Sequence, residues 1–509
     1  MDDVAQTLAS DWKYVSEGGA TIVFSYVGSP NPSYDGMVLR LRKAVNLGRP
    51  VDGMVNEDEP DDPIIEYQKR CMERLLSREN LPLLRSVRLE RTWLEQLAEK
   101  HDKERPEARS RKDQIDFTRQ KGVLATDLVG GDWIAVEVKP KWAFLPSHSH
   151  LSEETKAKKV QTCRFCMHSF MRNKKNPEYV NHYCPLDLFS GEADRVRKAI
   201  DALWDAWEHS NGGVNNLKLF AHGKVVLPGQ IERLVDEKTD KEAVHPEQIK
   251  QMFKQALFNT LMKTSVLKAI SRLQRTLDPL DIEGLSKLWR ETELQSPLYK
   301  SEHASYSEQP VSNERIPTTP LGASSIYLPA SEPSISDWVE FITNYQSNAA
   351  KEMDHSQPKA DHLRYYLLAY LLSATFKDCS IIVKLDFLRP GRQSTPTVYP
   401  VSVIDLDPKS LDRLQKWEQL DREIGLSKLE QQSRTRKTVL EKKLSRNEKI
   451  SDADAVWLDH DANLIDGVAI IAFFKENTEE LLHTFNRQLR LEEVARLKDT
   501  RIDEYFTRK

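Results

Sequence analysis

Two acidic residues lie at the ends of apolar segments in the last third of the chain. Asp378 precedes an expected strand over residues 380–385, and Asp405 follows a second one over residues 400–404. Carboxylates at the ends of neighbouring strands can divide the work of phosphoryl transfer, one orienting an acceptor hydroxyl and the other holding Mg²⁺. An Asp is also a common turn residue. The pair therefore predicts either a phosphotransfer site or two polar turns.

A glycine turn near the N-terminus has a composition suited to phosphate. In Glu17-Gly-Gly-Ala20, adjacent glycines let backbone N–H groups face a phosphate without an intervening Cβ. Arg40 and Lys43 follow on the next expected strand, in the order by which kinase-like proteins cover ATP phosphates. The chain has no G-x-x-x-x-G-K-[ST] and no G-x-G-x-x-G, so a Walker or dinucleotide site finds no support. The turn indicates ATP binding, with an ordinary hairpin as the alternative.

A short basic segment continues an expected strand over residues 133–138. Strand alternation places Glu137, Lys139 and Lys141 on one face, and Pro140 stiffens the exit from the strand. Two lysines on one face could meet phosphates, whereas the plainer interpretation is a charged edge strand. The segment therefore predicts either a pair of phosphate-binding cations or a charged edge strand.

The run from Lys156 to Lys175 holds seven Lys or Arg residues, His168 and no acid. If it is helical, Arg164, His168 and Arg172 repeat every four residues and line one face. This face could bind several phosphates, or it could be a solvated helix surface. An RNA-binding interpretation is weaker, because the run carries few aromatic residues for base stacking.

Cysteines in and after this run raise the question of zinc. Cys163-x-x-Cys166 is followed by His168, His182 and Cys184. His168 would have to leave the basic face, and no second C-x-x-C supports a closed structural site. We therefore favour buried free thiols over zinc.

The elements that position these residues alternate between strands and helices. Apolar periodicity predicts a β-meander over residues 12–43, followed by a mostly helical middle of the chain with helices at 193–208, 247–274 and 361–374. Residues 296–334 are rich in Ser and Pro and predict a mobile insertion, 430–449 are strongly charged, and 477–505 have amphipathic helical spacing.

Composition restricts the class of protein. The chain of 509 residues carries 74 Lys and Arg against 78 Asp and Glu, a net charge of −4, so no global positive field draws it to nucleic acid or membrane. Five cysteines are few and odd in number, which is typical of a reducing compartment. We find no secretory signal and no apolar stretch long enough to span a bilayer. We expect an intracellular protein, in the nucleus, the cytoplasm or both.

With these residues assembled, the chain resembles the inositol pentakisphosphate 2-kinase family from about Trp12 to Ile424. The matching motifs are Glu17-Gly-Gly-Ala20, Glu137-Val-Lys-Pro-Lys141, Arg164-Phe-Cys-Met-His168, Tyr183-Cys-Pro-Leu-Asp-Leu-Phe-Ser-Gly191, Lys377-Asp-Cys-Ser-Ile381 and Ile404-Asp-Leu-Asp-Pro-Lys409. The resemblance implies transfer of the γ-phosphate of ATP to the 2-hydroxyl of inositol 1,3,4,5,6-pentakisphosphate, giving inositol hexakisphosphate. It also implies an α+β, two-lobed, protein-kinase-like fold with a β-rich N-lobe and a larger, mostly helical C-lobe that carries the inositol-phosphate site.

The same resemblance implies a role for each residue of the site. Asp378 would orient the 2-hydroxyl, Lys139 would face the transferring phosphate, and Asp405 would bind Mg²⁺. The ATP contacts would come from Gly18, Gly19, Ala20, Thr21, Arg40, Asp127 in the hinge beside adenine, and Glu137 toward the nucleoside. The inositol-phosphate contacts would come from Arg109, Lys141, Arg164, His168, Arg172, Asn216, Lys218, Lys409 and Arg413.

Three departures from the family pattern limit what is carried over. Many members have a zinc site of two cysteines and two histidines in the region matching residues 290–335, where this chain has only His303, so we expect no zinc. At positions 172 and 218, Arg and Lys are exchanged relative to some members of the family. Such an exchange keeps the positive charge but alters the geometry of the hydrogen-bond donors, because only Arg presents a planar fork of N–H groups. Trp417 replaces a Tyr that contacts a phosphate, and that contact is not carried over.

The domain prediction rests on these motifs. We expect an N-lobe with the glycine turn and hinge over 1–128, a C-lobe over 129–426 and a charged helical extension over 427–509. The expected partners are ATP, Mg²⁺ and inositol pentakisphosphate. We expect the protein to bind neither membranes nor nucleic acid and to be a monomer. The alternative is a non-catalytic protein on a kinase-like fold that binds inositol phosphates or RNA, although such a protein would tolerate loss of Asp378 or Asp405 and both are present.

Overall fold

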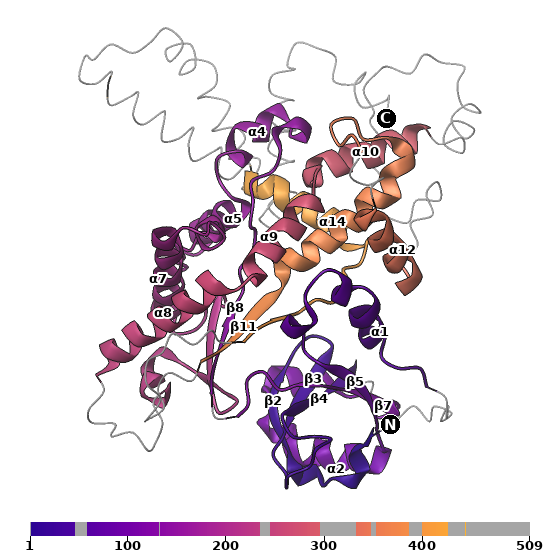
Figure 1. The fold of residues 1–509 in the computed structure, drawn as a ribbon, viewed down its shortest axis with the longest axis vertical. Coiled ribbons are helices and arrows are strands. Elements are labelled where there is room, and N and C mark those ends of the chain that lie inside the picture. The colour runs from indigo at the N-terminus through magenta and orange to yellow at the C-terminus, as the bar shows by residue number, and fades with distance from the viewer. Residues whose placement is uncertain are drawn as a thin grey trace, which may run out of the picture. The chain divides into compact units, whose positions relative to one another are not determined.

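The computed structural model describes residues 2–45, 59–131, 133–234, 245–295, 332–347, 353–385 and 400–425, together with Lys443. The chain divides into a compact unit over Met1–Arg422 and a second over Glu423–Lys509. The predicted insertion at 296–334 lies outside the described residues except for 332–334, and so do the predicted terminal helix at 477–505 and nearly all of the charged segment at 430–449. The first unit is α+β and contains two sheets with helices packed around them (Figure 1).

The first sheet contains the predicted meander. β2 (Trp12–Glu17), β3 (Thr21–Tyr26) and β4 (Met37–Val45) pair antiparallel in sequence order, which confirms that prediction. The sheet continues through β7 (Lys121–Thr126) and β5 (Leu84–Arg88) to β1 (Asp2–Asp3), while β6 (Asp113–Ile115) pairs with the end of β4. Trp12, Ile22 and Leu39 pack with Trp93 and Leu94 of α2 (Arg91–His101), so one face of the sheet is buried under this helix.

The second sheet is fully antiparallel, in the order β10-β9-β8-β11-β12. Its strands are β8 (Ile134–Val138), β9 (Leu217–Ala221), β10 (Lys224–Val226), β11 (Ser380–Leu385) and β12 (Val401–Ile404). Every residue of β8 is buried, because Ile134, Val136 and Val138 join the main core on one side and Ala135 joins a smaller cluster on the other. An apolar run of this length is typical of a strand buried on both faces.

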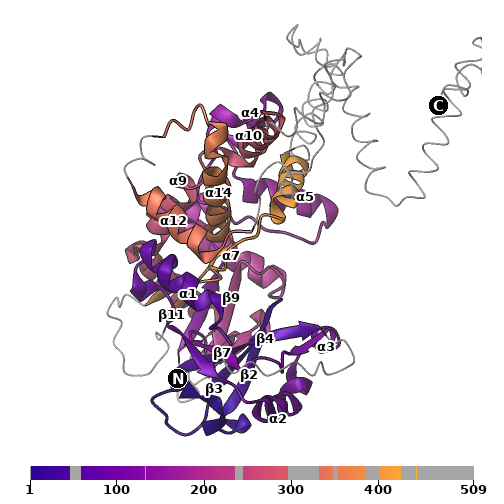
Figure 2. The same ribbon diagram turned by 90° about the vertical axis from the view of Figure 1, so that its right-hand side faces the viewer.

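Helices cover the main core. They comprise α1 (Pro63–Arg70), α5 (Arg164–Lys175), α6 (Pro185–Leu188), α7 (Ala193–His209), α8 (Pro246–Lys263), α9 (Val266–Thr276), α10 (Asp281–Gln295), α12 (Ile335–Gln346), α14 (Leu363–Asp378) and a helix over residues 413–425. Two further helices are α3 (Glu107–Ser110), which packs against β6, and α4 (Glu153–Lys159). α14 is apolar around nearly its whole circumference and packs against α9, α10 and α12, which explains why it is buried (Figure 2). None of the described helices has the length and apolar character needed to cross a bilayer.

The single helix predicted over residues 247–274 is divided into two helices, α8 and α9, in the structure. The pattern over residues 247–274 reads as continuous, but Thr264 leaves the helical region at ψ 142° and its hydroxyl accepts a hydrogen bond from the Val266 amide at 3.2 Å. Local bonding of this kind by Thr competes with the helix ladder, so α8 ends and α9 begins at this point.

A buried ion cluster joins three helices. Lys159 at the end of α4 lies within 3.0 Å of carboxylate oxygens of Asp281, Glu283 and Asp421. Burial by itself would lower the pKa of Lys159, but the carboxylates of Asp281 and Asp421 outweigh burial and raise that pKa. One cation therefore pairs with acids from α10 and from the helix that contains Asp421.

Replacing Lys159 should destabilise the fold strongly. In Lys159→Met the acids lose their shared cation, and breaking a buried ion pair in this way costs about 3 to 5 kcal/mol. Urea denaturation measures the loss. Lys156→Met is the matched control, because its ion pair with Glu153 is at the surface and should contribute less than about 1 kcal/mol. Equal effects of the two substitutions would contradict the prediction.

Candidate active site

A cavity of about 380 Å³ lies where the two sheets meet. Among the residues that line it are the predicted site residues Gly18, Thr21, Arg40, Asp127, Glu137, Lys139, Lys218 and Asp405. Gly19 and Ala20 belong to the same glycine turn as Gly18. Apolar side chains from both sheets complete the walls, among them Val23 and Val38 from the first and Ile382 and Val403 from the second. A cavity with apolar walls on which polar and charged groups converge is typical of a ligand site.

The glycine turn is anchored by a buried ion cluster behind it. The carboxylate of Glu17 pairs with Lys43 and, at 3.0 Å, with Arg105, and Lys43 also reaches Asp113 at 2.9 Å. The Lys43 side chain is 3% exposed, so it is unavailable to a phosphate, contrary to the expectation from sequence. Lys43 and Arg40 are three residues apart in a strand, so they point to opposite faces, and only Arg40 lines the cavity.

Asp127 forms the link between the two sheets. Its carboxylate accepts hydrogen bonds from the Ser25 hydroxyl, from the Val129 amide at 3.0 Å and from the Gly130 amide at 2.6 Å. A Cβ at Gly130 would clash with this carboxylate, so the turn requires glycine there. The Asp127 side chain is thus occupied in shaping the link, and its backbone carbonyl accepts a hydrogen bond from Lys384 at 3.1 Å.

Lys139 sits between two carboxylates at one end of the cavity. Its Nζ lies 3.3 Å from Oδ2 of Asp405 and 3.6 Å from Oε1 of Glu137. Burial by itself would lower the pKa of Lys139, but these two carboxylates outweigh burial and raise the pKa. Asp405 is held in turn by the Ser380 hydroxyl at 3.0 Å, and its φ of 62° turns the chain sharply after β12.

Lys141 belongs to a second cluster. Its Nζ lies 3.1 Å from Oδ1 of Asp378, whose Oδ2 accepts from Lys409 at 3.0 Å. The prediction that Lys141 shares a face with Glu137 and Lys139 is therefore wrong, because β8 ends at Val138 and Lys141 has a left-handed φ of 63°. Burial would raise the pKa of Asp378, but the charges of Lys141 and Lys409 outweigh burial and lower it.

The predicted basic helix exists as α5. Cys163 caps its N-terminus, and Arg164 Nε donates to Asp421 at 2.8 Å while its guanidinium lies 4.8 Å from the ring centre of Trp142. Arg172, one turn from the C-terminus, stacks on Tyr179 at 4.2 Å. Arg164 is thus largely fixed by the protein, whereas Arg172 is exposed.

His168 lies on the same helix in a strongly positive environment. Burial first, and then the charges of Arg164, Arg172 and Lys141, lower its pKa to about 4. The ring is therefore neutral at pH 7 in the free protein, and at this pH negative charge arriving nearby would favour its protonation.

The remaining predicted contacts differ in position. Asn216 is buried and fixes the basic segment, because its backbone carbonyl accepts from the Lys139 amide at 3.0 Å and its Nδ2 donates to the Lys139 carbonyl at 3.2 Å. Lys218 lies 3.6 Å from Glu137. Arg109 on α3 lies with the glycine turn, where Nη1 donates to the Gly18 carbonyl at 2.7 Å, and Arg413 is exposed at the start of its helix.

Several residues of the site were missed from sequence. Asp407 also lines the cavity, and Ser380 bridges Glu137 and Asp405 at 3.0 Å each. Tyr183 donates to the Pro140 carbonyl at 2.8 Å and so holds the basic segment. Asp407, Ser380 and Tyr183 all lie within the family motifs, and this position in the sequence could have identified them as residues of the site. Gln274, which bonds the Lys141 carbonyl at 2.8 Å, lies in a helix with no such signal.

Comparison with known proteins places the chain among the kinases, consistent with a glycine turn, a lysine and aspartates around one cavity. A family model described as inositol-pentakisphosphate 2-kinase matches residues 14–423. The chain belongs to the inositol-pentakisphosphate 2-kinase family, which confirms the resemblance found in its motifs.

Individual relatives agree with this assignment. A Cryptococcus neoformans protein named inositol-pentakisphosphate 2-kinase is 32% identical over 439 residues, covering 82% of this chain and 94% of the relative. An Arabidopsis thaliana protein of the same name is 26% identical and covers 82% of this chain and 92% of its own length. A Danio rerio protein of that name is 32% identical over 43% of this chain and 44% of its own.

The protonation state of His168 can be measured directly. In ¹³C-histidine-labelled protein, the signal assigned by its loss in His168→Asn should stay in the neutral form down to about pH 5, whereas exposed histidines titrate near pH 6.5. As the pH falls, His168 in the unfolded chain is protonated at a higher pH than His168 in the folded protein. Its contribution to stability is therefore complete above about pH 6.5 and is lost as the pH falls toward 4. A titration midpoint near 6.5 would contradict the burial and charge argument.

Proposed function

We propose that this protein transfers the γ-phosphate of ATP to the 2-hydroxyl of inositol 1,3,4,5,6-pentakisphosphate and releases inositol hexakisphosphate. The observation that carries the proposal is the segment Lys139-Pro-Lys141. Lys139 faces the cavity and Asp405, and two residues later Lys141 faces Asp378 and Lys409. The chain thus passes within one turn from a nucleotide-sized cavity to a cluster of cations beside an acid.

The cavity suits ATP in a two-lobed, protein-kinase-like arrangement with the first sheet as one lobe. A Cβ built at Gly18 or Gly19 would meet no atom within 4 Å, so there is space beside the turn for a phosphate. The Gly18 amide itself closes the turn by donating to the Thr21 carbonyl at 2.9 Å. Arg40 on the adjoining strand would add a cation. The pKa of Lys139 is raised, so its ammonium persists and can neutralise charge on the transferring group.

Asp405 and Asp407 have the donor chemistry for Mg²⁺. Both residues line the cavity, Asp405 lies beside Lys139, and hard carboxylate oxygens are the protein ligands that Mg²⁺ prefers. The ion would neutralise phosphate charge and align the nucleotide. Ser380 would keep Asp405 oriented through its hydrogen bond at 3.0 Å.

The acceptor side suits a highly phosphorylated inositol. The five phosphates of the substrate carry a total charge of roughly −7 to −10, and neutralising this charge requires cations from several segments of the chain. We assign the contacts to Arg109, Lys141, Arg164, His168, Arg172, Asn216, Lys218, Lys409 and Arg413. Arg109 would reach the ligand from beside the glycine turn, and His168 would gain its proton as phosphate arrives.

Asp378 would orient the 2-hydroxyl. Its pKa is lowered by Lys141 and Lys409, so it is a carboxylate at neutral pH and accepts a hydrogen bond from the hydroxyl. A weakly basic carboxylate suits a transfer in which positioning dominates over early proton removal.

A single assay tests the activity. Purified protein with Mg²⁺, ATP and inositol 1,3,4,5,6-pentakisphosphate should form inositol hexakisphosphate, resolved by anion-exchange chromatography, in amounts equal to the ADP released. Binding of the pentakisphosphate without turnover would instead identify a non-catalytic binder, and binding of RNA alone would exclude both.

Asp378→Asn should separate catalysis from binding. Loss of the carboxylate should lower kcat by about a hundredfold or more, in the range expected for a positioned acid–base group. The KM for inositol pentakisphosphate should not rise, because the substitution frees Lys141 and Lys409 from an acid. Asp205→Asn on the exposed face of α7 is the control and should leave both constants unchanged. An increase in KM with an unchanged kcat would reassign Asp378 to substrate binding.

Arg172→Ala should weaken acceptor binding selectively. Charge-assisted phosphate bonds contribute roughly 1.5 to 3 kcal/mol, so the KM for inositol pentakisphosphate should rise about tenfold to a hundredfold while the KM for ATP stays within about twofold. The increase should shrink at high salt. Arg172 is preferable to Arg164, whose removal would also leave Asp421 with one partner fewer. Lys287→Ala, exposed on α10, controls for general charge loss, and an equal rise in both KM values at Arg172 would contradict the assignment.

A further inference from the structure

A buried glutamine joins the two chain segments that carry Lys141 and Asp378. Gln274 lies on α9 and is 0% exposed. Its Nε2 donates to the carbonyl groups of Lys141 and Phe376, each at 2.8 Å, and its Oε1 accepts from the Ala143 amide at 2.8 Å. One side chain therefore bonds both to the basic segment and to the backbone two residues before Asp378.

The chemistry of this contact is specific to glutamine. A primary amide offers two N–H donors and a carbonyl acceptor, and at Gln274 both donors and the oxygen are bonded. Glutamate in its ionised form would have no donor for the two carbonyl groups, methionine would bond to none of the three backbone groups, and asparagine would be one methylene shorter. A buried polar group whose bonds are all made favours a single arrangement of its neighbours.

The ion pair between Lys141 and Asp378 needs support from beneath. The side chain of Asp378 is 57% exposed and that of Lys141 is 20% exposed, and ion pairs at such positions add little to stability. Lys141 also adopts a left-handed φ of 63°, which is unfavourable for a residue other than glycine. Gln274 bonds the chain on both sides of this strained point, at the Lys141 carbonyl and at the Ala143 amide.

A second buried contact joins the same two segments. Nζ of Lys377 lies 4.0 Å from the centre of the Trp142 ring. The ion-pair partner of Lys377 is Asp278, and the two side chains are 3% and 2% exposed. The segments thus meet twice, through the ion pair at the site and through a cation–π contact in the core. Hydrogen bonds are the more directional contacts, so the bonds of Gln274 determine how the segments are aligned.

Gln274 is itself fixed to the helix that ends at Asp378. The Ser373 hydroxyl of α14 donates to the Gln274 carbonyl at 2.8 Å, and α9 packs against α14 in the core (Figure 1). α14 ends at Asp378. The backbone of Gln274 is therefore anchored to one segment while its side chain bonds to both.

We propose that Gln274 is a positioning residue for phosphoryl transfer, which sets the separation of Lys141 and Asp378 and so aligns the acceptor hydroxyl. The effect on turnover rests on the proposed function, whereas the effect on the two segments does not. Transfer depends on alignment, and a displacement of about 1 Å can lower a rate by about a hundredfold. ATP binding should change little, because the side-chain bonds of Gln274 go to the acceptor side of the site.

A double-mutant cycle with Asp378 tests this role. Gln274→Met should lower kcat by about tenfold to a hundredfold and leave the KM for ATP within about twofold. In the Asp378→Asn background the same substitution should lower kcat by less than about threefold, because the carboxylate that Gln274 aligns is already absent. A purely structural role would lower kcat by the same factor in both backgrounds, and that result would overturn the proposal.

Two further variants make the cycle interpretable. Thr260→Val is the matched control, because it removes a buried hydrogen bond inside α8, and it should leave kcat within about twofold. Gln274→Glu replaces Gln274→Met if circular dichroism shows that the latter does not fold. A carboxyl buried beside two carbonyl oxygens stays protonated and keeps one donor and one acceptor, so this variant should lose fewer bonds and less activity.

Hydrogen exchange gives a readout that needs no turnover. By mass spectrometry, the peptide that contains Ala143 should exchange faster in the Gln274 variant than in wild type, and it should be unchanged in Thr260→Val. Unchanged exchange in the Gln274 variant would overturn the proposal whatever the activity of the protein. Faster exchange in a protein that does not phosphorylate inositol pentakisphosphate would support the hold of Gln274 on the two segments and refute the proposed function.

Discussion

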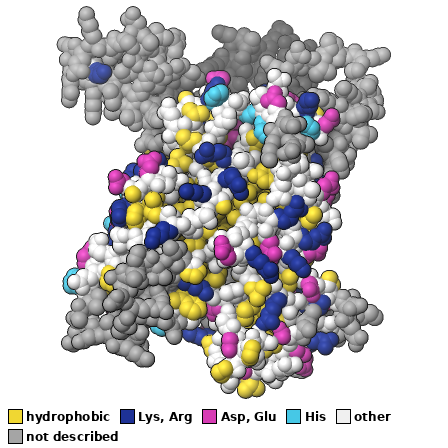
Figure 3. All heavy atoms as spheres, viewed as in Figure 1, with side chains coloured by type: hydrophobic (Ala, Val, Ile, Leu, Met, Phe, Trp, Pro, Cys, Tyr) yellow, Lys and Arg dark blue, Asp and Glu magenta, His cyan; other side chains and the backbone are white. Residues whose placement is uncertain are grey.

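The main physical constraint on the site is the repulsion between its closely spaced cations, because the protein must also be stable when no anionic ligand is bound. Four cations of the site are held by carboxylates from other parts of the chain: Lys139 by Asp405, Lys141 and Lys409 by Asp378, and Arg164 by Asp421. Like charges in a partly desolvated site would otherwise repel by several kcal/mol. These acids offset part of the positive charge of the empty site. Lys and Arg side chains are likewise interspersed with Asp and Glu on the face of the molecule shown in Figure 3.

Backbone geometry brings these pairs into contact. Lys141 and Asp405 both adopt left-handed φ values near 60°, which is unusual for residues other than glycine and is found where surrounding structure enforces it. For the Lys139-Pro-Lys141 segment the enforcing contacts are hydrogen bonds to its backbone from Asn216, Tyr183 and Gln274. The site is thus assembled by polar side chains that bond to the backbone, and those side chains come from three separate segments of the chain: the turn before β9, the segment before α6, and α9.

Sequence predicted the local parts of this arrangement well. Alternation and apolar runs gave the meander and the buried strands β8, β11 and β12, and the spacing of Arg164, His168 and Arg172 gave α5. Family motifs then indicated which acids and cations belong to one site. These signals succeed because they are set by residues adjacent in the chain or in one helix.

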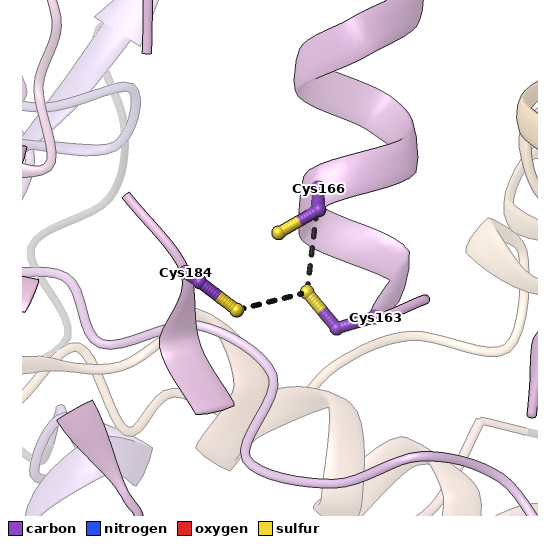
Figure 4. A group of neighbouring side chains, drawn as sticks. All are labelled: Cys163, Cys166 and Cys184. Atoms are coloured by element: carbon purple, nitrogen blue, oxygen red, sulfur yellow. Dashed lines mark hydrogen bonds between the residues drawn. The ribbon is translucent and has the colours of Figure 1, made fainter. Parts of the chain in front are cut away.

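The errors came from pairings between distant segments. Lys43 was grouped with the phosphate-binding cations, but strand alternation directs it to Glu17 and Asp113 on the opposite face. Strand periodicity was extended to Lys141 past the end of β8, where a left-handed residue breaks it. The meeting of Cys184 with Cys163 and Cys166 could not be read from spacing, because it depends on how the segment before α6 packs against α5 (Figure 4).

The acids of the site have a further property that matters for ligand exchange, because each keeps a second partner when one cation turns to a phosphate. Asp421 bonds both Arg164 and Lys159, Asp378 bonds both Lys141 and Lys409, and Asp405 bonds Ser380 as well as Lys139. For Asp421, whose side chain is 4% exposed, the loss of every partner would cost several kcal/mol and weaken binding by that amount, whereas water can solvate Asp378 and Asp405, which are more than half exposed. With two partners per acid, a cation can move to the ligand while the acid stays satisfied. The same pairing that keeps the empty site stable therefore also permits anions to enter it.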